Sequence, residues 1–385
     1  MLTSINFKNF KSYQQATLPL AAVTFLIGAN ASGKSNALEA IRLLHWLAKG
    51  TRLDDIEREI GGKTAFRGYV EDLFHAVGAP LELGASFSTA DEAQCDFEIA
   101  IQFRDKKLSI CNDVLKPESD MPFYDMKPDG NGNLQLTINN QFTNGPNEWN
   151  QAVNGQYAMF YRLENILPNS GPNWAKALRL HLRNIFMLNA HPAAMRGYAN
   201  LRDEELEEDG SNLSAVLHRI CQQSDGAKQQ LLSFIRSLPE QDITDIRFIE
   251  TERRDVMVRL QENFGGRQRL IDAPLLSDGT LRVLAIAAAL LTAPEGALVI
   301  IEEIDNGVHP SRAELLLQQM SAIAGQRHLR LLLTSHNPAL LDALPDQALA
   351  DVLCCYRDPQ DGNSRLVRLG DMERYPELIA QGQRV

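Results

Sequence analysis

Short apolar runs alternate with helical patterns near the start of the chain. The run 23–27 (Val-Thr-Phe-Leu-Ile) has the composition of a buried strand, and apolar residues then recur at helical spacing over 34–49. Gly50 is placed to end that helix. Before this run, residues 2–20 alternate apolar and polar positions around a bend at 9–12. The pattern predicts two strands, a third buried strand, a loop and a helix.

The middle of the chain changes from a period of two to helical spacing. Between Leu81 and Tyr161, apolar residues recur at every second position and loops rich in Pro, Gly and Asn separate the runs, which predicts an antiparallel sheet. Helical spacing dominates over 173–238, where Ser211 and Asn212 are placed to cap one helix. We interpret the acidic stretch 203–209 before that helix as a solvated face.

Two strands are expected over 246–249 and 256–260. After them, strands (298–301, 329–334 and 351–356) alternate with helices (281–291, 311–323 and 338–344), which predicts a parallel sheet covered on both faces. The predicted fold class is α/β, with a mixed or parallel core sheet, an antiparallel β lobe and a helical insertion. We expect an N-terminal lobe over 1–165, the insertion over 166–244 and a C-terminal lobe over 245–385.

Composition and charge argue against several classes of protein. The 385 residues are 44% hydrophobic and carry a formal net charge of −11, which argues against a general nucleic-acid coat. No apolar run is long enough for a membrane span, and the first residues do not resemble a signal peptide. The five cysteines show no metal-ligand spacing and are expected to be free thiols. We expect a cytoplasmic protein.

The strongest chemical signal follows the buried strand at 23–27. The segment Gly28-Ala29-Asn30-Ala31-Ser32-Gly33-Lys34-Ser35 matches the pattern G-x-x-x-x-G-K-[ST], the Walker A motif, in full. Glycines let backbone N–H groups surround a polyphosphate at a helix N-terminus. The lysine in this pattern reaches the β- and γ-phosphates, and the hydroxyl after it binds Mg²⁺. The segment predicts a site for a nucleoside triphosphate with Mg²⁺, either ATP or another purine triphosphate.

Three weaker motifs follow the phosphate loop along the chain, at Ser277, at Glu302 and at His336. The strand 298–301 ends in Glu302 and Glu303, where one carboxylate can hold Mg²⁺ and the next can orient water, although Asp is more usual at the first position. Ser277-Asp278-Gly279 opens a helix, and by itself it is an ordinary cap and turn. His336 follows the strand 329–334, where a lone histidine is usually structural. Their order after the phosphate loop favours function in each case.

These elements in this order resemble the ATP-binding-cassette (ABC) type ATPases of the RecF, structural-maintenance-of-chromosomes (SMC) and OLD group, which are P-loop NTPases. The segments Phe7-Lys-Asn-Phe-Lys-Ser-Tyr13 and Asn30-Ala-Ser-Gly-Lys-Ser-Asn36-Ala-Leu-Glu-Ala40 are similar as well. The stretch from Glu302 to His309-Pro310 is similar to the OLD-like branch. The specific resemblance covers roughly residues 1–50 and 265–345.

The resemblance implies roles for individual residues. Glu303 would be the catalytic base, and His336 would sense the γ-phosphate. Glu302 and Ser35 would hold Mg²⁺. Asp305 and Asn306 would lie in a loop that crosses a dimer interface. Residues at the ATP would be Gly28, Ala29, Asn30, Ala31, Ser32, Gly33, Lys34, Ser35 and Asn36, completed from a second subunit by Ser277, Asp278 and Gly279. The glutamine of many relatives has two candidate equivalents, the segment Arg67–Asp72 or Gln102.

Two features distinguish this chain from branches of the group. About 240 residues separate Ser35 from Ser277 without sustained heptads. A coiled coil of the SMC kind would be broken by prolines at 117, 146, 168, 172, 192 and 239. OLD nucleases append a TOPRIM domain of roughly 100 residues, whereas fewer than 50 residues follow Asn337 here. We therefore expect no nuclease within this chain.

Three functions remain open from the sequence. The leading one is an ATPase that dimerises around two ATP molecules, or forms a higher homo-oligomer, and switches a separate effector. By analogy, the separate effector is a nuclease or toxin of a bacterial anti-phage system. Any nucleic acid would then be contacted indirectly. The alternative is a RecF-like repair clamp that binds duplex DNA through a basic groove, to which Lys8, Lys11, Arg253, Arg254 and Arg259 would contribute. The third is a scaffold that binds ATP and barely hydrolyses it.

Overall fold

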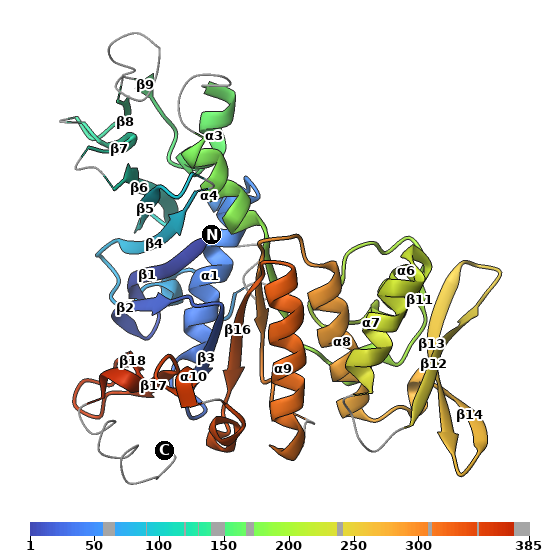
Figure 1. Cartoon of the computed structure of the whole chain (residues 1–385). Helices are drawn as coiled ribbons and strands as arrows, with labels where there is room; N and C mark the ends of the chain where they lie inside the picture. Colours follow the sequence, from blue (N-terminus) through green and yellow to red (C-terminus); the bar gives the residue numbers. More distant parts are fainter. Residues whose placement is uncertain are drawn as a thin grey trace. The chain divides into compact units, whose positions relative to one another are not determined.

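The computed structural model describes residues 1–56, 66–89, 91–118, 121–129, 131–139, 151–166, 173–236, 242–306, 310–344 and 346–372. Two compact units share the chain. Unit 1 comprises residues 1–21, 29–185 and 354–367, and unit 2 comprises 22–28, 186–353 and 368–385. Figure 1 shows their elements by label. Because the chain passes several times between the units, each contains segments that are far apart in the sequence.

Unit 1 is built on an eight-stranded antiparallel sheet with the order β2-β1-β4-β5-β6-β7-β8-β9. Its strands are β1 Leu2–Phe10, β2 Tyr13–Pro19, β4 Leu81–Ser88, β5 Gln94–Arg104, β6 Lys107–Pro117, β7 Tyr124–Pro128, β8 Leu134–Ile138 and β9 Gln151–Ala152. Asn9 and Lys11 adopt positive φ angles at the bend between β1 and β2. The antiparallel sheet predicted for the middle of the chain is confirmed, and the first two strands extend it.

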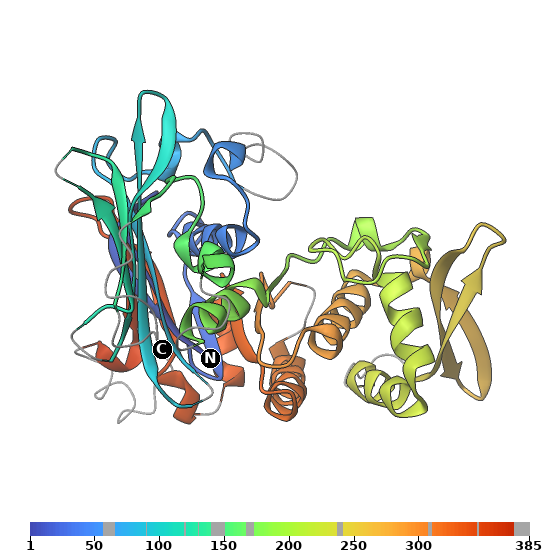
Figure 2. The same cartoon turned by 90° about the horizontal axis from the view of Figure 1, so that it is seen from above.

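Three helices lie on one face of that sheet, as Figure 2 shows: α1 Lys34–Ala48, α3 Met159–Ile166 and α4 Trp174–Arg183. The apolar side of α1 is buried, and Gly50 follows its end with a φ of 78°, as the sequence predicts. The remaining strands of unit 1 form the C-terminal hairpin, β17 Leu353–Arg357 and β18 Ser364–Arg368.

Unit 2 contains the predicted parallel strands, β3 Val23–Ile27, β15 Leu298–Ile301 and β16 Arg330–Ser335. All four residues of β15 are buried, which explains its continuous apolar run. A fourth strand, β10 Ile185–Leu188, lies beside β15. The helical pattern did not predict β10, because a strand of four residues shows no period of its own.

The helices of unit 2 are α5 Pro192–Met195, α6 Leu213–Gln223, α7 Asp225–Ile235, α8 Asp278–Thr292, α9 Pro310–Gln326 and α10 Asp346–Leu349. A second antiparallel sheet packs on α6 and α7 and comprises β11 Ala199–Asn200, β12 Ile243–Glu250, β13 Asp255–Phe264 and β14 Arg267–Asp272. Asn212 is the N-cap residue of α6, at the predicted position, but its side chain makes no capping hydrogen bond to the helix. The side chain of Asn212 bonds Glu205 and Glu207 in the preceding acidic loop instead.

All five cysteines are free. Among the described residues, no helix combines the length and the apolar character needed to cross a membrane.

Candidate nucleotide-binding site

The carboxyl ends of three parallel strands meet at one edge of the sheet in unit 2. Ile27 of β3 pairs with Ser335 of β16, and Ile301 of β15 pairs with Leu333 of β16. The backbone N–H of Gly28 donates to the carbonyl of Ser335 over 3.3 Å. Within unit 2, the chain therefore leaves the sheet at this edge at Gly28, the first residue of the phosphate loop (Gly28–Ser35), at the paired acids and at His336. In open α/β sheets, ligands bind at this edge.

The phosphate loop turns directly into α1. Gly33 has a φ of 121° and Ala31 a φ of 64°, both in the region that favours glycine. No side chain of the described residues caps α1, and its first turn carries no acid, so its N-terminal N–H groups remain suited to an anion. Ala29, Asn30, Ala31 and Ser35 are exposed, Gly33 and Lys34 are partly exposed, and Ser32 is buried. The Lys34 ammonium donates to the carbonyl of Ala29 over 3.0 Å.

The paired acids are held by backbone contacts on both sides of β15. The N–H of Glu302 donates to the carbonyl of Leu188 over 2.9 Å, so β10, the strand that the sequence did not predict, positions the first acid. Glu303 is exposed and has a φ of 51°, and its N–H donates to the Thr334 hydroxyl over 3.0 Å. Its carboxylate accepts a hydrogen bond from the Asn306 amide. A left-handed conformation at a non-glycine residue costs of order 1–3 kcal/mol and is typical of functional sites.

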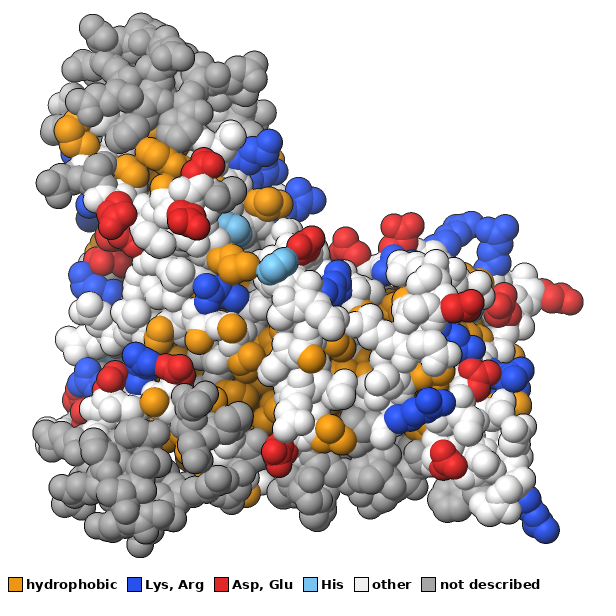
Figure 3. Space-filling view, in the orientation of Figure 1, with side chains coloured by type: hydrophobic (Ala, Val, Ile, Leu, Met, Phe, Trp, Pro, Cys, Tyr) orange, Lys and Arg blue, Asp and Glu red, His pale blue; other side chains and the backbone are white. Residues whose placement is uncertain are grey.

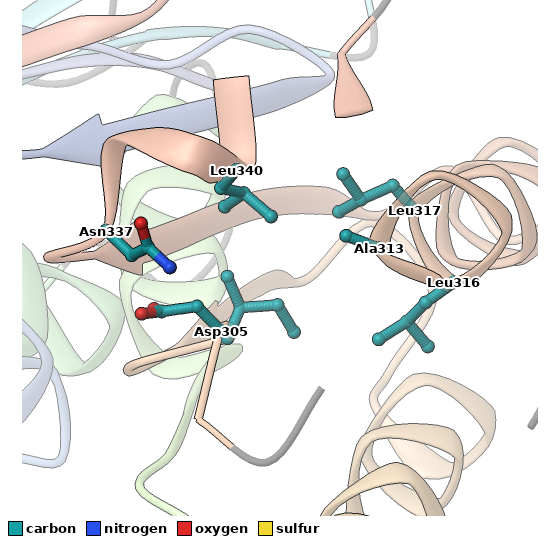
Figure 4. Close-up of a pocket in the computed structure, with 7 residues that line it drawn as sticks. Asp305, Ala313, Leu316, Leu317, Asn337 and Leu340 are labelled. Atoms are coloured by element: carbon teal, nitrogen blue, oxygen red, sulfur yellow. The ribbon is translucent and has the colours of Figure 1, made fainter. Parts of the chain in front are cut away.

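Asp305 and His336 face each other inside unit 2. One carboxylate oxygen of Asp305 lies 3.5 Å from Nδ1 of His336, and the Asp305 side chain is 8% exposed. The other oxygen has no hydrogen-bond partner among the described residues. Figure 4 shows Asp305 and Asn337 at one end of a small pocket whose apolar wall includes Leu316, Leu317 and Leu340. The Asp305 side chain is thus buried against His336 of the same chain. His309 lies outside the described residues.

The Ser277 motif forms the N-terminus of α8. The Ser277 hydroxyl accepts the N–H of Thr280 over 3.1 Å, which makes Ser277 the N-cap, and Gly279 lies in the first turn. The guanidinium of Arg196 bonds the Asp278 carboxylate over 2.5 Å and the carbonyls of Pro274 and Leu276 over 2.9 and 2.7 Å. Arg196 therefore holds this loop in place. A single arginine about 80 positions away gave no signal in the sequence.

A buried ion pair connects α1 to the bend between β1 and β2. Glu39 pairs with Lys11 and with Arg67, each over 2.6 Å, and the Glu39 and Lys11 side chains are only 8% exposed. Arg67 also donates to the Asn36 amide oxygen over 3.3 Å, so this candidate segment lies beside the phosphate loop within unit 1. The other candidate, Gln102, bonds Ser109 on the neighbouring strand of the sheet.

The basic residues considered for a DNA groove are mostly neutralised. Lys8 pairs with Glu82, Lys11 with Glu39, and Arg259 with Asp272, at 2.6–2.9 Å. On the face shown in Figure 3, acidic and basic side chains of the described residues are interspersed. Arg253 and Arg254 are exposed in the turn between β12 and β13. Paired surface charges leave little net field for a polyanion.

Comparison with solved structures identifies the fold. The chain matches an Smc head bound to the C-winged helix domain of ScpA, with a TM-score of 0.52, 15% identity and coverage of 95% of this chain and 97% of that one. An Smc head with an extended coiled coil, bound to a ScpA domain derived from Pyrococcus furiosus, matches with a TM-score of 0.53, 14% identity and coverage of 98% and 99%. The fold is that of an ABC-type ATPase head.

Two sequence comparisons add the family. The family described as "AAA domain, putative AbiEii toxin, Type IV TA system" matches residues 23–106 and 162–342, which is more than half of the chain. The chain belongs to this AAA-domain family of ATPases. The DNA replication and repair protein RecF of Caulobacter sp. (strain K31) is 39% identical over 71 residues, which is 18% of this chain and 18% of that protein. The alignment thus spans about a fifth of that relative.

Proposed function

We propose that this chain binds and hydrolyses ATP with Mg²⁺, and that nucleotide-bound subunits associate to switch a separate effector. The observation that carries the proposal is the shared sheet edge, where the phosphate loop begins beside the paired acids and His336. Membership of an ATPase family supports the same activity.

Each residue has a definite task in this proposal. Backbone N–H groups from Gly28 to Lys34 bind the phosphates, and the Lys34 ammonium neutralises the charge that develops on them. Ser35 and Glu302 supply the hard oxygen donors that Mg²⁺ prefers and would hold the ion, which screens the phosphates. Glu303 orients the attacking water and accepts its proton. His336, held by Asp305, contacts the γ-phosphate.

The Ser277 motif (Ser277-Asp278-Gly279) is the basis for proposing an association of two subunits. Ser277 and Asp278 are exposed at the N-terminus of α8, a helix of 15 residues, so that a second subunit can reach them. Resemblance to ABC-type ATPases assigns Ser277, Asp278 and Gly279 to the nucleotide of a second subunit, with Asp305 nearby. We extend the proposal to a homodimer or a higher homo-oligomer with composite sites.

The biological setting is inferred from the family and from one stretch of sequence. The family description names a putative toxin of a type IV toxin–antitoxin system, which supports a bacterial toxin–antitoxin or defence setting. The separately encoded nuclease or toxin is proposed by analogy with related ATPases. The OLD-like subtype rests on the stretch from Glu302 to Pro310. The regions 1–165, 166–244 and 245–385 remain our proposed division into functional lobes and an insertion.

The test compares two neighbouring acids. Glu303→Gln should abolish phosphate release yet retain ATP, so light scattering should show the mass double when Mg-ATP is added. Glu302→Gln is the matched control, because it removes a metal-holding oxygen one position earlier and should weaken Mg²⁺-dependent binding as well. Wild-type protein without ATP turnover would refute the proposed activity. A Glu303→Gln variant that binds ATP but stays monomeric would refute composite sites.

A further inference from the structure

The C-terminal strand β18 begins directly against the phosphate loop, within unit 1. Ser364, its first residue, is 1% exposed. Its backbone N–H donates to the carbonyl of Ser12 over 2.8 Å. Its hydroxyl oxygen lies 2.7 Å from the carbonyl oxygen of Ser32 and 2.7 Å from the hydroxyl oxygen of Ser12. Ser364 therefore joins the bend after β1 to the phosphate loop.

The direction of these hydrogen bonds follows from their atoms. A carbonyl oxygen can only accept, so the single hydroxyl proton of Ser364 is donated to Ser32. Ser364 must then accept the proton of the Ser12 hydroxyl. Ser12 in turn accepts from the side-chain amide of Asn36 over 2.8 Å. The result is one chain of bonds, from Asn36 through Ser12 and Ser364 to the Ser32 carbonyl, in which each hydroxyl donates once and accepts once. Such chains strengthen their members.

This chain ends on the peptide group that shapes the phosphate loop. In a planar trans peptide, the C=O and the following N–H point in opposite directions. Holding the Ser32 carbonyl toward Ser364 therefore turns the N–H of Gly33 to the opposite side. The next carbonyl, that of Gly33, accepts the Ala37 N–H over 3.0 Å in the first turn of α1 and the Tyr13 hydroxyl over 3.2 Å, so the N–H of Lys34 is turned away from these donors. Two successive N–H groups so directed form an anion-binding concavity.

The contact is also sterically tight. A Cβ atom on Gly33 would lie 2.3 Å from the Ser364 hydroxyl oxygen and 2.7 Å from its Cβ. The loop backbone thus approaches Ser364 as closely as a glycine allows. Ser364 limits both the direction and the position of the Ser32–Gly33 peptide.

We propose that Ser364, supported by Ser12, is a positioning residue for the phosphate loop, so that the hairpin β17–β18 belongs to the nucleotide-binding machinery. The inference rests on the proposed function, namely that a nucleotide phosphate binds at this loop. Ser364 bonds the carbonyl side of the peptide and acts on the phosphate only through Gly33.

The experiment measures the affinity of the full-length chain for Mg-ADP by calorimetric titration, together with urea unfolding. Ser364→Ala should raise Kd about tenfold, which corresponds to about 1.4 kcal/mol. Ser214→Ala is the matched control, because Ser214 is also 1% exposed and its hydroxyl also bonds a backbone group, the N–H of Val258, in unit 2. It should reduce stability similarly and leave Kd unchanged.

A second variant makes the test independent of how well Ser364→Ala folds. Ser12→Ala should raise Kd by about threefold, and the double variant should bind no more weakly than Ser364→Ala, because Ser12 acts through Ser364. Equal affinities of wild type, Ser364→Ala and Ser12→Ala would overturn the inference while leaving the proposed function intact. A wild-type chain that does not bind Mg-ADP would instead overturn the proposed function and this inference with it.

Discussion

Asp113 predicts an unusual dependence of stability on pH. Its side chain is fully buried between β6 and α3, where it accepts the Tyr124 hydroxyl over 2.7 Å and the N–H of Met159, the first residue of α3, over 2.6 Å. Burial raises the pKa of this carboxyl from 3.8 to about 7, despite the two hydrogen bonds that lower it. The folded protein therefore holds the Asp113 proton more tightly than the unfolded chain does.

The stabilisation from this proton is present below pH 3.8 and is lost as the pH rises through 7. This difference in pKa between the folded and unfolded protein corresponds to about 4 kcal/mol in total, of which about 3 kcal/mol falls between pH 5 and pH 8. Asp113→Asn keeps an accepting oxygen and removes the titration. We expect the wild type to lose about 3 kcal/mol more unfolding free energy than the variant over this interval.

Urea unfolding followed by tryptophan fluorescence measures this difference. Trp46 and Trp174 both lie in unit 1, and the Trp174 ring is 5.6 Å from that of Phe123, next to Tyr124. Asp125→Asn, at a partly exposed acid on β7, is the matched control and should retain the wild-type pH dependence. The same pH dependence in wild type and Asp113→Asn would show that Asp113 does not hold a proton in the folded state, and would refute the reasoning.

Three further predictions concern other buried or bridging groups. Arg196→Ala should lower kcat at least tenfold with Mg-ADP affinity unchanged, because it releases the Ser277 loop but not the phosphate loop; equal kcat would contradict this. Glu39→Gln should cost about 3 kcal/mol in urea unfolding, because it leaves the Lys11 ammonium without its counter-charge, whereas Arg67→Ala, at a 66% exposed partner, should cost less than about 1 kcal/mol. Burial lowers the pKa of His45 from 6.5 to about 4. The wild type should therefore keep its full free energy of unfolding above pH 6.5 and lose part of it as the pH falls toward 4, because His45 must then be protonated while buried. Urea unfolding of His45→Gln should not show this decrease.

Several features of the site were predictable because they depend on neighbours in the chain. The phosphate loop was evident from Gly28 to Ser35, since a tight turn around phosphates needs glycine at set positions before a helix. The buried strand 298–301 was evident from its unbroken apolar run, and the structure places β15 there. Positions of the paired acids followed from the end of that strand. Their chemical roles remain predictions.

Contacts between distant segments were not predictable in this way. The four residues of β10 become a strand because they lie beside β15, where Leu188 accepts the Glu302 N–H. Arg196 acquires its role only where the chain brings α5 to the start of α8. Asp113 is an ordinary polar residue of an alternating strand until α3 covers it and removes it from water.

The sequence by itself determined the class of fold and the position of the phosphate loop, because periodicity and glycine placement act over a few residues. Only the tertiary structure decided which residues support that loop. Ser12 and Ser364 are 352 positions apart and share a hydrogen bond because β18 begins beside the bend after β1. A hydroxyl group carries no record of its partner in the local pattern. Whether two distant hydroxyl groups form a hydrogen bond depends on how the elements between Ser12 and Ser364 pack in the folded chain.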